Sequence, residues 1–436
     1  MTSREKELLH LLHKEVKPAL GCTEPIAVAL ATAKAVELVS ERVSLDRMTM
    51  TSQMKLHVYV SGNILKNGMG VGIPGTGMIG LRIAAALGAV CGRSEYGLEV
   101  LKDLNDNAIK RAKELVAEGN VCIDREGNCH KLYVKCVVEA DGHSAWCVIE
   151  DEHDRIVETG IDGEVEKRSR TEDTGGCEER ETRDYHLTVK EIYEFAGSVD
   201  YEDIKFILED RTLNLALAQE GLKGDYGLKV GKTIQANADT VFGNDFLSYA
   251  MALTAAASDA RMAGCTLPAM SNSGSGNQGI TVSMPIIAYA LKYDVSDEKL
   301  ARALILSNLV AIHIKGYLGR LSALCGCVVA STGSSCGLVW LKGGSYEMVC
   351  SAIKNMIGNI TGMVCDGAKV GCAMKVASGV SSSIQSAVLA LDGIHACETD
   401  GIIDKDIEKT ISNLGSVGST GMEMADDLIQ KIMVCK

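Results

Sequence analysis

The feature that most constrains this chain is a concentration of cysteines in residues 321–375. Six of the 16 cysteines fall within these 55 positions, and several have a glycine or alanine beside them. Thiolates hold iron–sulfur clusters, and small neighbouring residues leave room for the inorganic core. The same pattern also suits a helical core, because free cysteine is among the most buried residue types. The spacings lack the paired C-x2-C form of a structural zinc site, which makes zinc the weaker alternative. The six are Cys325, Cys327, Cys336, Cys350, Cys365 and Cys372.

Composition narrows the class of protein. The 436 residues provide material for two or three domains, and 46% hydrophobic with 23% charged residues is ordinary globular usage. The net charge of -13 argues against a nucleic-acid partner, because phosphate binding needs clustered lysine and arginine. The charged start lacks the apolar core of a signal peptide, and the apolar runs are too short to span a bilayer. We therefore expect a cytoplasmic protein with reduced thiols and no membrane partner.

The N-terminal segment places one cysteine in a distinctive position. Residues Glu5–Val16 form an amphipathic helical pattern, which Pro18 interrupts, and a second helix is predicted from Thr23 to about Ser40. Cys22 then lies just outside a helix N-terminus, where the partial positive charge stabilises a thiolate. A reactive cysteine and a small buried residue in a tight turn both remain open.

The next part of the chain carries strand patterns. Six of the seven even-numbered residues of Arg47–Val60 are apolar, as in a half-buried strand. Short apolar segments separated by turn signals over Val121–Gly160 predict a small antiparallel β meander. Asp162–Asp184 is charged and has no apolar period, so we expect an exposed connector.

From Thr188 onward the pattern is helical, with two breaks. The segment Ser271–Gly279 is rich in glycine and side-chain donors and leads directly into a helix, so it is a candidate site for a carboxylate or phosphate. A flexible linker is the alternative. The second predicted break, Ala330–Gly337, lies between the two parts of the cysteine cluster.

These patterns predict an α+β protein with a mostly helical catalytic domain, an N-terminal α/β part and a small antiparallel β meander. We expect the N-terminal part, with Cys22, to span residues 1–120. The meander and connector would span 121–185, and the helical part 186–436.

Four motifs together resemble the L-cysteine desulfidases, distant relatives of the alpha chain of iron–sulfur-dependent L-serine dehydratases. They are Gly21–Pro25, Ser271–Gly279, Cys325–Cys327 and Cys365–Lys369, and the resemblance covers nearly the whole chain. It implies a 4Fe–4S cluster held by three cysteines, with one iron open to substrate and no pyridoxal phosphate. The implied ligands are Cys365, Cys372 and, some 40 positions upstream, Cys325, for which Cys327 is a rival. Cys22 matches the catalytic cysteine.

The resemblance also implies an activity, carbon–sulfur lyase chemistry on a small amino-acid substrate. L-Cysteine would undergo β-elimination to pyruvate, ammonia and hydrogen sulfide. The active form would be a monomer or a homo-oligomer. Lys369 would contact the carboxylate or the cluster, with a structural lysine as the alternative. An L-serine dehydratase on the same scaffold and a non-catalytic iron–sulfur sensor are the competing functions. The substrate-binding candidates are Asn272, Ser273, Ser275, Asn277 and Lys369.

Overall fold

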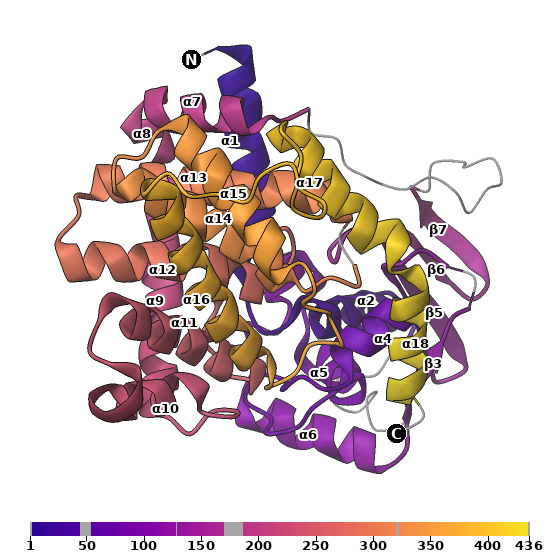
Figure 1. Ribbon diagram of the computed structural model, residues 1–436. Coiled ribbons are helices and arrows are strands. Elements are labelled where there is room, and N and C mark those ends of the chain that lie inside the picture. Colours follow the sequence, from indigo (N-terminus) through magenta and orange to yellow (C-terminus); the bar gives the residue numbers. More distant parts are fainter. Residues whose placement is uncertain (1, 44–53, 128, 170–185, 320–321, 435–436) are drawn as a thin grey trace.

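The computed structural model describes residues 2–43, 54–127, 129–169, 186–319 and 322–434 (Figure 1). The protein is mostly helical with a mixed α/β N-terminal region, which confirms the predicted α+β class. Within the described residues, no helix is both long and apolar enough to cross a membrane. The division of the chain near residues 120 and 185 stays a prediction.

A six-stranded sheet in the order β3-β2-β4-β5-β6-β7 organises the N-terminal region. Alternate residues of β2, Leu56, Val58 and Val60, are fully buried, as the apolar alternation predicts. The antiparallel meander is confirmed for β4 to β6, whereas β3 pairs in parallel with β2. The strands are β2 (Lys55–Val60), β3 (Val121–Arg125), β4 (Tyr133–Ala140), β5 (His143–Glu150), β6 (Ile156–Ile161) and β7 (Glu164–Arg168).

The connector predicted over 162–184 is wrong in its first part, because Glu164–Arg168 forms the edge strand β7. All five residues are exposed and four are charged, so the apolar alternation that signals a strand is missing. Residues 170–185 of that segment lie outside the described residues, as do residues 47–53 of the predicted strand.

Helices α2 and α5 form a closely packed pair against the sheet, where α2 contacts β4 and β5. Their close approach depends on Gly88, because a Cβ there would lie 2.3 Å from the carbonyl oxygen of Ala29. The helices of this region are α2 (Thr23–Ser40), α4 (Gly62–Gly68), α5 (Leu81–Cys91) and α6 (Asp106–Ala117), with the 3-10 segment η1 (Ser94–Glu99).

A second hydrophobic core holds the C-terminal helices together, and α1 (Ser3–Glu15) belongs to it through Leu8, Leu11 and Leu12. The chain then passes through β1 (Val16–Ala19), which pairs antiparallel with β8 (Ala269–Asn272). The remaining elements are α7 (Val189–Ser198), α8 (Tyr201–Ile204), η2 (Lys205–Leu208), α9 (Glu209–Lys223), α10 (Val230–Ala236), η3 (Ala238–Phe242), α11 (Phe246–Met262), α12 (Gly276–Tyr293), α13 (Asp297–Leu318), α14 (Gly326–Leu341), α15 (Tyr346–Ile360), α16 (Cys372–Leu391), α17 (Ile407–Ser416), η4 (Val417–Gly421) and α18 (Glu423–Val434).

The break predicted over Ala330–Gly337 is wrong, because this segment lies inside the buried helix α14. Its hydroxyls are satisfied within the protein: Thr332 donates to the carbonyl of Val328 at 2.8 Å, for example. Its glycines permit close packing, since a Cβ on Gly333 would lie 2.4 Å from the carbonyl oxygen of Ser307. Serine and glycine, which usually indicate a turn, here let α14 fit between its neighbours.

Candidate active site

Two cysteine-bearing segments that are distant in sequence lie side by side. The backbone N–H of Cys325 donates to the carbonyl of Met363 at 2.9 Å, and that of Cys365 donates to the carbonyl of Ala323 at 2.7 Å. Cys325 immediately precedes α14, and Cys372 is the first residue of α16. Two of the three predicted ligands are therefore at helix N-termini.

The three thiols lie within electrostatic reach of one another. Burial raises the pKa of Cys325 well above its ordinary value, and charges on Cys327, Cys365 and Cys372 raise it further. Burial also raises the pKa of Cys372, and the charge on Cys365 adds to this effect. Thiolates are the ligating form, so a bound metal centre would relieve the repulsion among them.

Cys327, the alternative candidate for the first ligand, packs between two helices. Its thiol donates to the carbonyl of Lys375 at 3.1 Å. Gly379 of α16 faces it so closely that a Cβ there would lie 2.4 Å from the sulfur. These contacts hold the Cys327 thiol between α14 and α16.

The loop between Cys365 and Cys372 contains an ionic cluster. Asp366 pairs with Lys369 at 2.5 Å and also with Lys375. Burial raises the pKa of Asp366, but the hydrogen bonds from the two lysines outweigh this effect and leave the pKa at about 2. Lys369 also donates to two local carbonyls, so the structure places it in contacts within its own loop. Two lysines against one carboxylate leave net positive charge beside the thiols.

The three predicted ligands supply the thiol chemistry that an iron–sulfur cluster needs. In the part of the chain that the structure describes, no three His, Cys, Asp or Glu side chains converge closely enough to hold one ion. A 4Fe–4S cluster instead binds each thiolate at a different iron, so its ligands surround a core and do not meet at one point. Cys325, Cys365 and Cys372 lie within electrostatic reach of one another, and glycine or alanine adjoins Cys325 and Cys372.

Cys22 is confirmed as the residue that precedes α2, and only 2% of it is exposed. Its Sγ lies 3.7 Å from Met262 Sδ. The expectation that the helix N-terminus lowers its pKa is wrong: burial raises the pKa to about 12, and the positive charge of Arg261 opposes this. Charges on Glu24 and Cys372 also raise the pKa, so Cys22 lies within electrostatic reach of the cysteine segments.

The predicted anion-binding loop, Ser271–Gly279, adjoins the Cys22 segment. Its first residues belong to β8, and α12 begins within it at Gly276. The hydroxyl of Thr23 donates to the carbonyl of Gly274 at 2.6 Å, which ties the start of α2 to the loop. Because the first N–H groups of a helix have no partner within it, the first turn of α12 is suited to an anion.

Most side chains of this loop are engaged in shaping it. Ser273 donates to Asn272 at 2.9 Å, and Asn272 donates to Asn308 at 2.8 Å. Ser275 caps α12 by accepting a backbone N–H of its first turn. Asn277 is half-buried and accepts from a neighbouring guanidinium. Of the four predicted contacts in this loop, Asn277 is thus the one at the helix N-terminus that meets a charged group.

A chain of buried polar side chains connects the loop to the cysteine segment. Asn308 donates to Asp210 at 3.1 Å, and Gln278 donates to Asn272 at 2.8 Å. The other amide atom of Gln278, Oε1, is buried without a hydrogen bond in the described structure. It lies against Gly326, where a Cβ would approach it to 3.2 Å. Gln278 of the loop therefore lies against Gly326, the residue between Cys325 and Cys327.

Arg261, near the end of α11, is a candidate functional residue that the sequence analysis missed. It is 4% exposed, and its guanidinium donates to the carbonyl of Gly21 at 2.9 Å and to Asn277 Oδ1 at 3.2 Å. Within the described residues, no carboxylate pairs with it and its Nε has no acceptor. A buried cation without an anion is costly. A lone arginine at a helix end gives no signal in the sequence.

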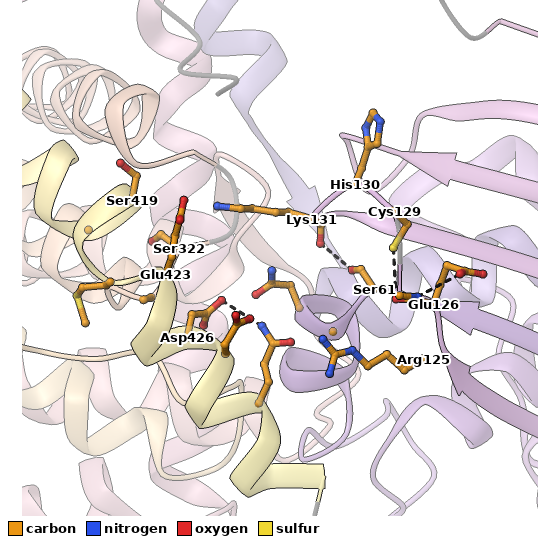
Figure 2. A pocket seen from close by; sticks show the side chains of 18 residues that line it. Ser61, Arg125, Glu126, Cys129, His130, Lys131, Ser322, Ser419, Glu423 and Asp426 are labelled. Carbon is orange, nitrogen blue, oxygen red and sulfur yellow. Dashed lines mark hydrogen bonds between the residues drawn. The ribbon is translucent and has the colours of Figure 1, made fainter. Parts of the chain in front are cut away.

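A pocket of about 270 Å³ lies nearby, between the end of β3 and helix α18. Figure 2 shows Arg125 and Lys131 on one side of it and Glu423 and Asp426 of α18 on the other. It adjoins the cysteine segments through Ala323 but contains none of the predicted site residues. The pocket is therefore a neighbour of the candidate site and distinct from it.

Comparison with known proteins identifies the family to which the chain is similar. Residues 95–430 match the family described as serine dehydratase alpha chain. The chain is 48% identical over 431 residues to a UPF0597 protein of Parabacteroides distasonis, covering 99% of this chain and 98% of that protein. It is 50% identical over 431 residues to a UPF0597 protein of Oleidesulfovibrio alaskensis, covering 98% of this chain and 97% of that protein.

Proposed function

Because the chain belongs to the serine dehydratase alpha-chain family, we propose that it is a lyase that eliminates sulfide from L-cysteine with the help of an iron–sulfur cluster. L-Cysteine and water give pyruvate, ammonia and hydrogen sulfide, without pyridoxal phosphate. The observation that supports this most strongly is the pairing of the Cys325 and Cys365 segments through two backbone hydrogen bonds, with Cys372 and Cys22 in electrostatic reach.

In this proposal Cys325, Cys365 and Cys372 hold a 4Fe–4S cluster. Cys325 is preferred over Cys327 because the latter thiol is held by the Lys375 carbonyl. When bound, the cluster supplies an open iron that acts as a Lewis acid toward the leaving sulfur. The net positive charge of the adjacent lysines offsets part of the negative charge of three thiolates.

The chain's own residues position the substrate and move its proton. The first turn of α12, with Asn277, receives the carboxylate, while Asn272, Ser273 and Ser275 shape the loop. Cys22 as thiolate takes the Cα proton, the C–S bond breaks, and 2-aminoacrylate forms. This product tautomerises and hydrolyses to pyruvate and ammonia. A thiol whose pKa is raised by burial is a strong base once ionised, and Arg261 favours the ionised form.

L-Serine is the second candidate substrate, because the matching family is described by serine dehydratase. The test is anaerobic reconstitution with iron and sulfide, followed by a pyruvate assay on both amino acids. A higher kcat/KM for cysteine, with equimolar sulfide, supports the proposal. A higher kcat/KM for serine would make the protein a serine dehydratase, and no pyruvate from either would favour a sensor.

The ligand assignment makes a separate prediction. Replacing Cys325, Cys365 or Cys372 with alanine removes a thiolate ligand, so the visible cluster absorption and the activity should disappear together. Cys350→Ala and Cys397→Ala are matched controls that should retain both. Equal loss of absorption in Cys350→Ala would show that the chosen ligands are the wrong set.

A further inference from the structure

We propose that Arg261 binds the α-carboxylate of the amino-acid substrate, an inference that rests on the proposed function and deepens it. Arg261 is 4% exposed, and among the described residues no acidic side chain pairs with it. Burying a guanidinium without a counterion is costly, so its position indicates an anion supplied from outside the chain.

The donors of Arg261 are only partly used. Gly21 and Asn277 each accept one hydrogen bond from its terminal nitrogens, the Cys22 thiol is a further hydrogen-bond partner, and Met262 Sδ lies 3.4 Å from one of these nitrogens. Its Nε has no acceptor within the described structure. Arginine presents five N–H donors in a planar fork that matches a carboxylate. The guanidinium therefore retains N–H groups that can donate to the carboxylate of a ligand.

The position of Arg261 also fits the chemistry. It joins Gly21, the residue before the proposed base Cys22, to Asn277 in the first turn of α12. Gly276 lets the guanidinium lie against this helix N-terminus, because a Cβ there would come within 2.2 Å of Nε. The substrate carboxylate is bonded to the carbon that loses its proton, so the carboxylate anchor has to lie beside the base.

Two other roles for Arg261 would give different results. It could act only as a structural tie between Gly21 and Asn277, or only as the counterion of the Cys22 thiolate. A structural tie would not distinguish a small molecule that carries a carboxylate from the matching neutral amide. A guanidinium neutralised by the thiolate would distinguish them far less than one whose N–H groups bind the carboxylate directly. The preference for a carboxylate over the matching amide is therefore the property to measure.

The first test needs neither cluster nor activity. Cluster-free protein is treated with iodoacetate or iodoacetamide, and alkylation of Cys22 is followed by peptide mass spectrometry. Both reagents attack the same thiolate, so the ratio of their rates is independent of the Cys22 pKa. We expect this ratio to be about 10-fold or more higher in the folded protein than in the urea-unfolded chain. Equal ratios in the folded and unfolded chains would overturn the proposal.

Variants of Arg261 test whether this residue causes the preference for iodoacetate. Arg261→Gln should abolish the preference for iodoacetate, and Arg261→Lys should keep part of it because the charge remains. Arg302→Gln is the matched control, since Arg302 pairs with Glu298 on its own helix, and it should behave as wild type. An unchanged preference in Arg261→Gln would assign the anion selectivity to another group.

The second test uses reconstituted enzyme with L-cysteine and L-cysteinamide. Arg261→Gln should lower kcat/KM for L-cysteine by about 10- to 100-fold, the range for a hydrogen bond to a charged group, and change the amide little. Equal losses for both substrates would mean that Arg261 acts structurally. If wild-type enzyme does not convert L-cysteine, the proposed function fails, whereas the alkylation ratio still decides the role of Arg261.

Discussion

Among single residues, Cys22 carries the proton chemistry of the proposed reaction. It is buried, its pKa is raised to about 12, and its nearest polarising contacts are Met262 and Arg261. It comes from a different segment than the three proposed cluster ligands. Removal of its thiol should therefore separate catalysis from cluster binding.

Cys22→Ser should leave the visible cluster spectrum unchanged and lower turnover by about 100-fold or more, because a serine hydroxyl is a far poorer base than a thiolate. The measurement pairs anaerobic visible spectra with pyruvate release. L-Cysteine should still perturb the spectrum of this variant. Loss of the cluster would make Cys22 a ligand, and full turnover would make it a structural residue.

Asp210 gives a prediction about pH. Burial raises its pKa from 3.8 to about 8, although the hydrogen bond from Asn308 opposes this. The folded state therefore holds the proton more tightly than the unfolded chain. The contribution of this group to the free energy of unfolding is greatest below pH 4 and declines as the pH rises to 8, by up to about 1.4 kcal/mol per pH unit.

Asp210→Asn keeps an oxygen acceptor for Asn308 and cannot ionise. The free energy of unfolding of the variant, relative to wild type, should therefore increase steadily from pH 4 to pH 8. Urea unfolding at four or five pH values in this window measures the difference. A constant difference across the window would show that Asp210 is ionised normally in the folded protein.

At the scale of elements, close helix contacts depend on glycine at positions where no side chain fits. The pair α2 and α5 is the example, since a Cβ on Gly88 would meet the backbone of Ala29 at 2.3 Å. Gly358 offers a contrast, because it lies in α15, is exposed, and would place a Cβ at an ordinary 3.5 Å from Ala396.

Gly88→Ala should lower the free energy of unfolding by about 1–3 kcal/mol, because the two helices must move apart. Gly358→Ala should leave it unchanged or raise it by up to about 1 kcal/mol, because alanine is the better helix former. Urea unfolding measures both. Equal effects in the two variants would show that α2 and α5 are not closely packed at Gly88.

At the scale of the whole molecule, the candidate site lies where the two hydrophobic cores meet. Cys22 belongs to the core of the N-terminal region, whereas the loop before α12 belongs to the helical part. The pairing of β1 with β8 and the contact of Thr23 with Gly274 join the two parts. The proposed reaction therefore needs both parts of the chain.

Sequence patterns predicted what depends on local periodicity and on motifs. They identified the fold class, the position of Cys22 before a helix and the loop before α12. They could not identify Arg261, because its significance comes from burial among residues that are distant in sequence. They also misjudged α14, where serine and glycine serve tight packing between helices and do not indicate a turn. In both cases the decisive information is tertiary contact.

The most direct measurement is the rate of sulfide release from L-cysteine as a function of cluster content. Protein is reconstituted anaerobically to graded iron and sulfide loads, and each sample is assayed for bound iron and for sulfide and pyruvate formed. We predict a rate proportional to cluster content that extrapolates to zero without cluster, with sulfide and pyruvate in equal amounts. A rate that is the same with and without cluster, or no sulfide at full loading, would contradict an iron–sulfur-dependent cysteine lyase.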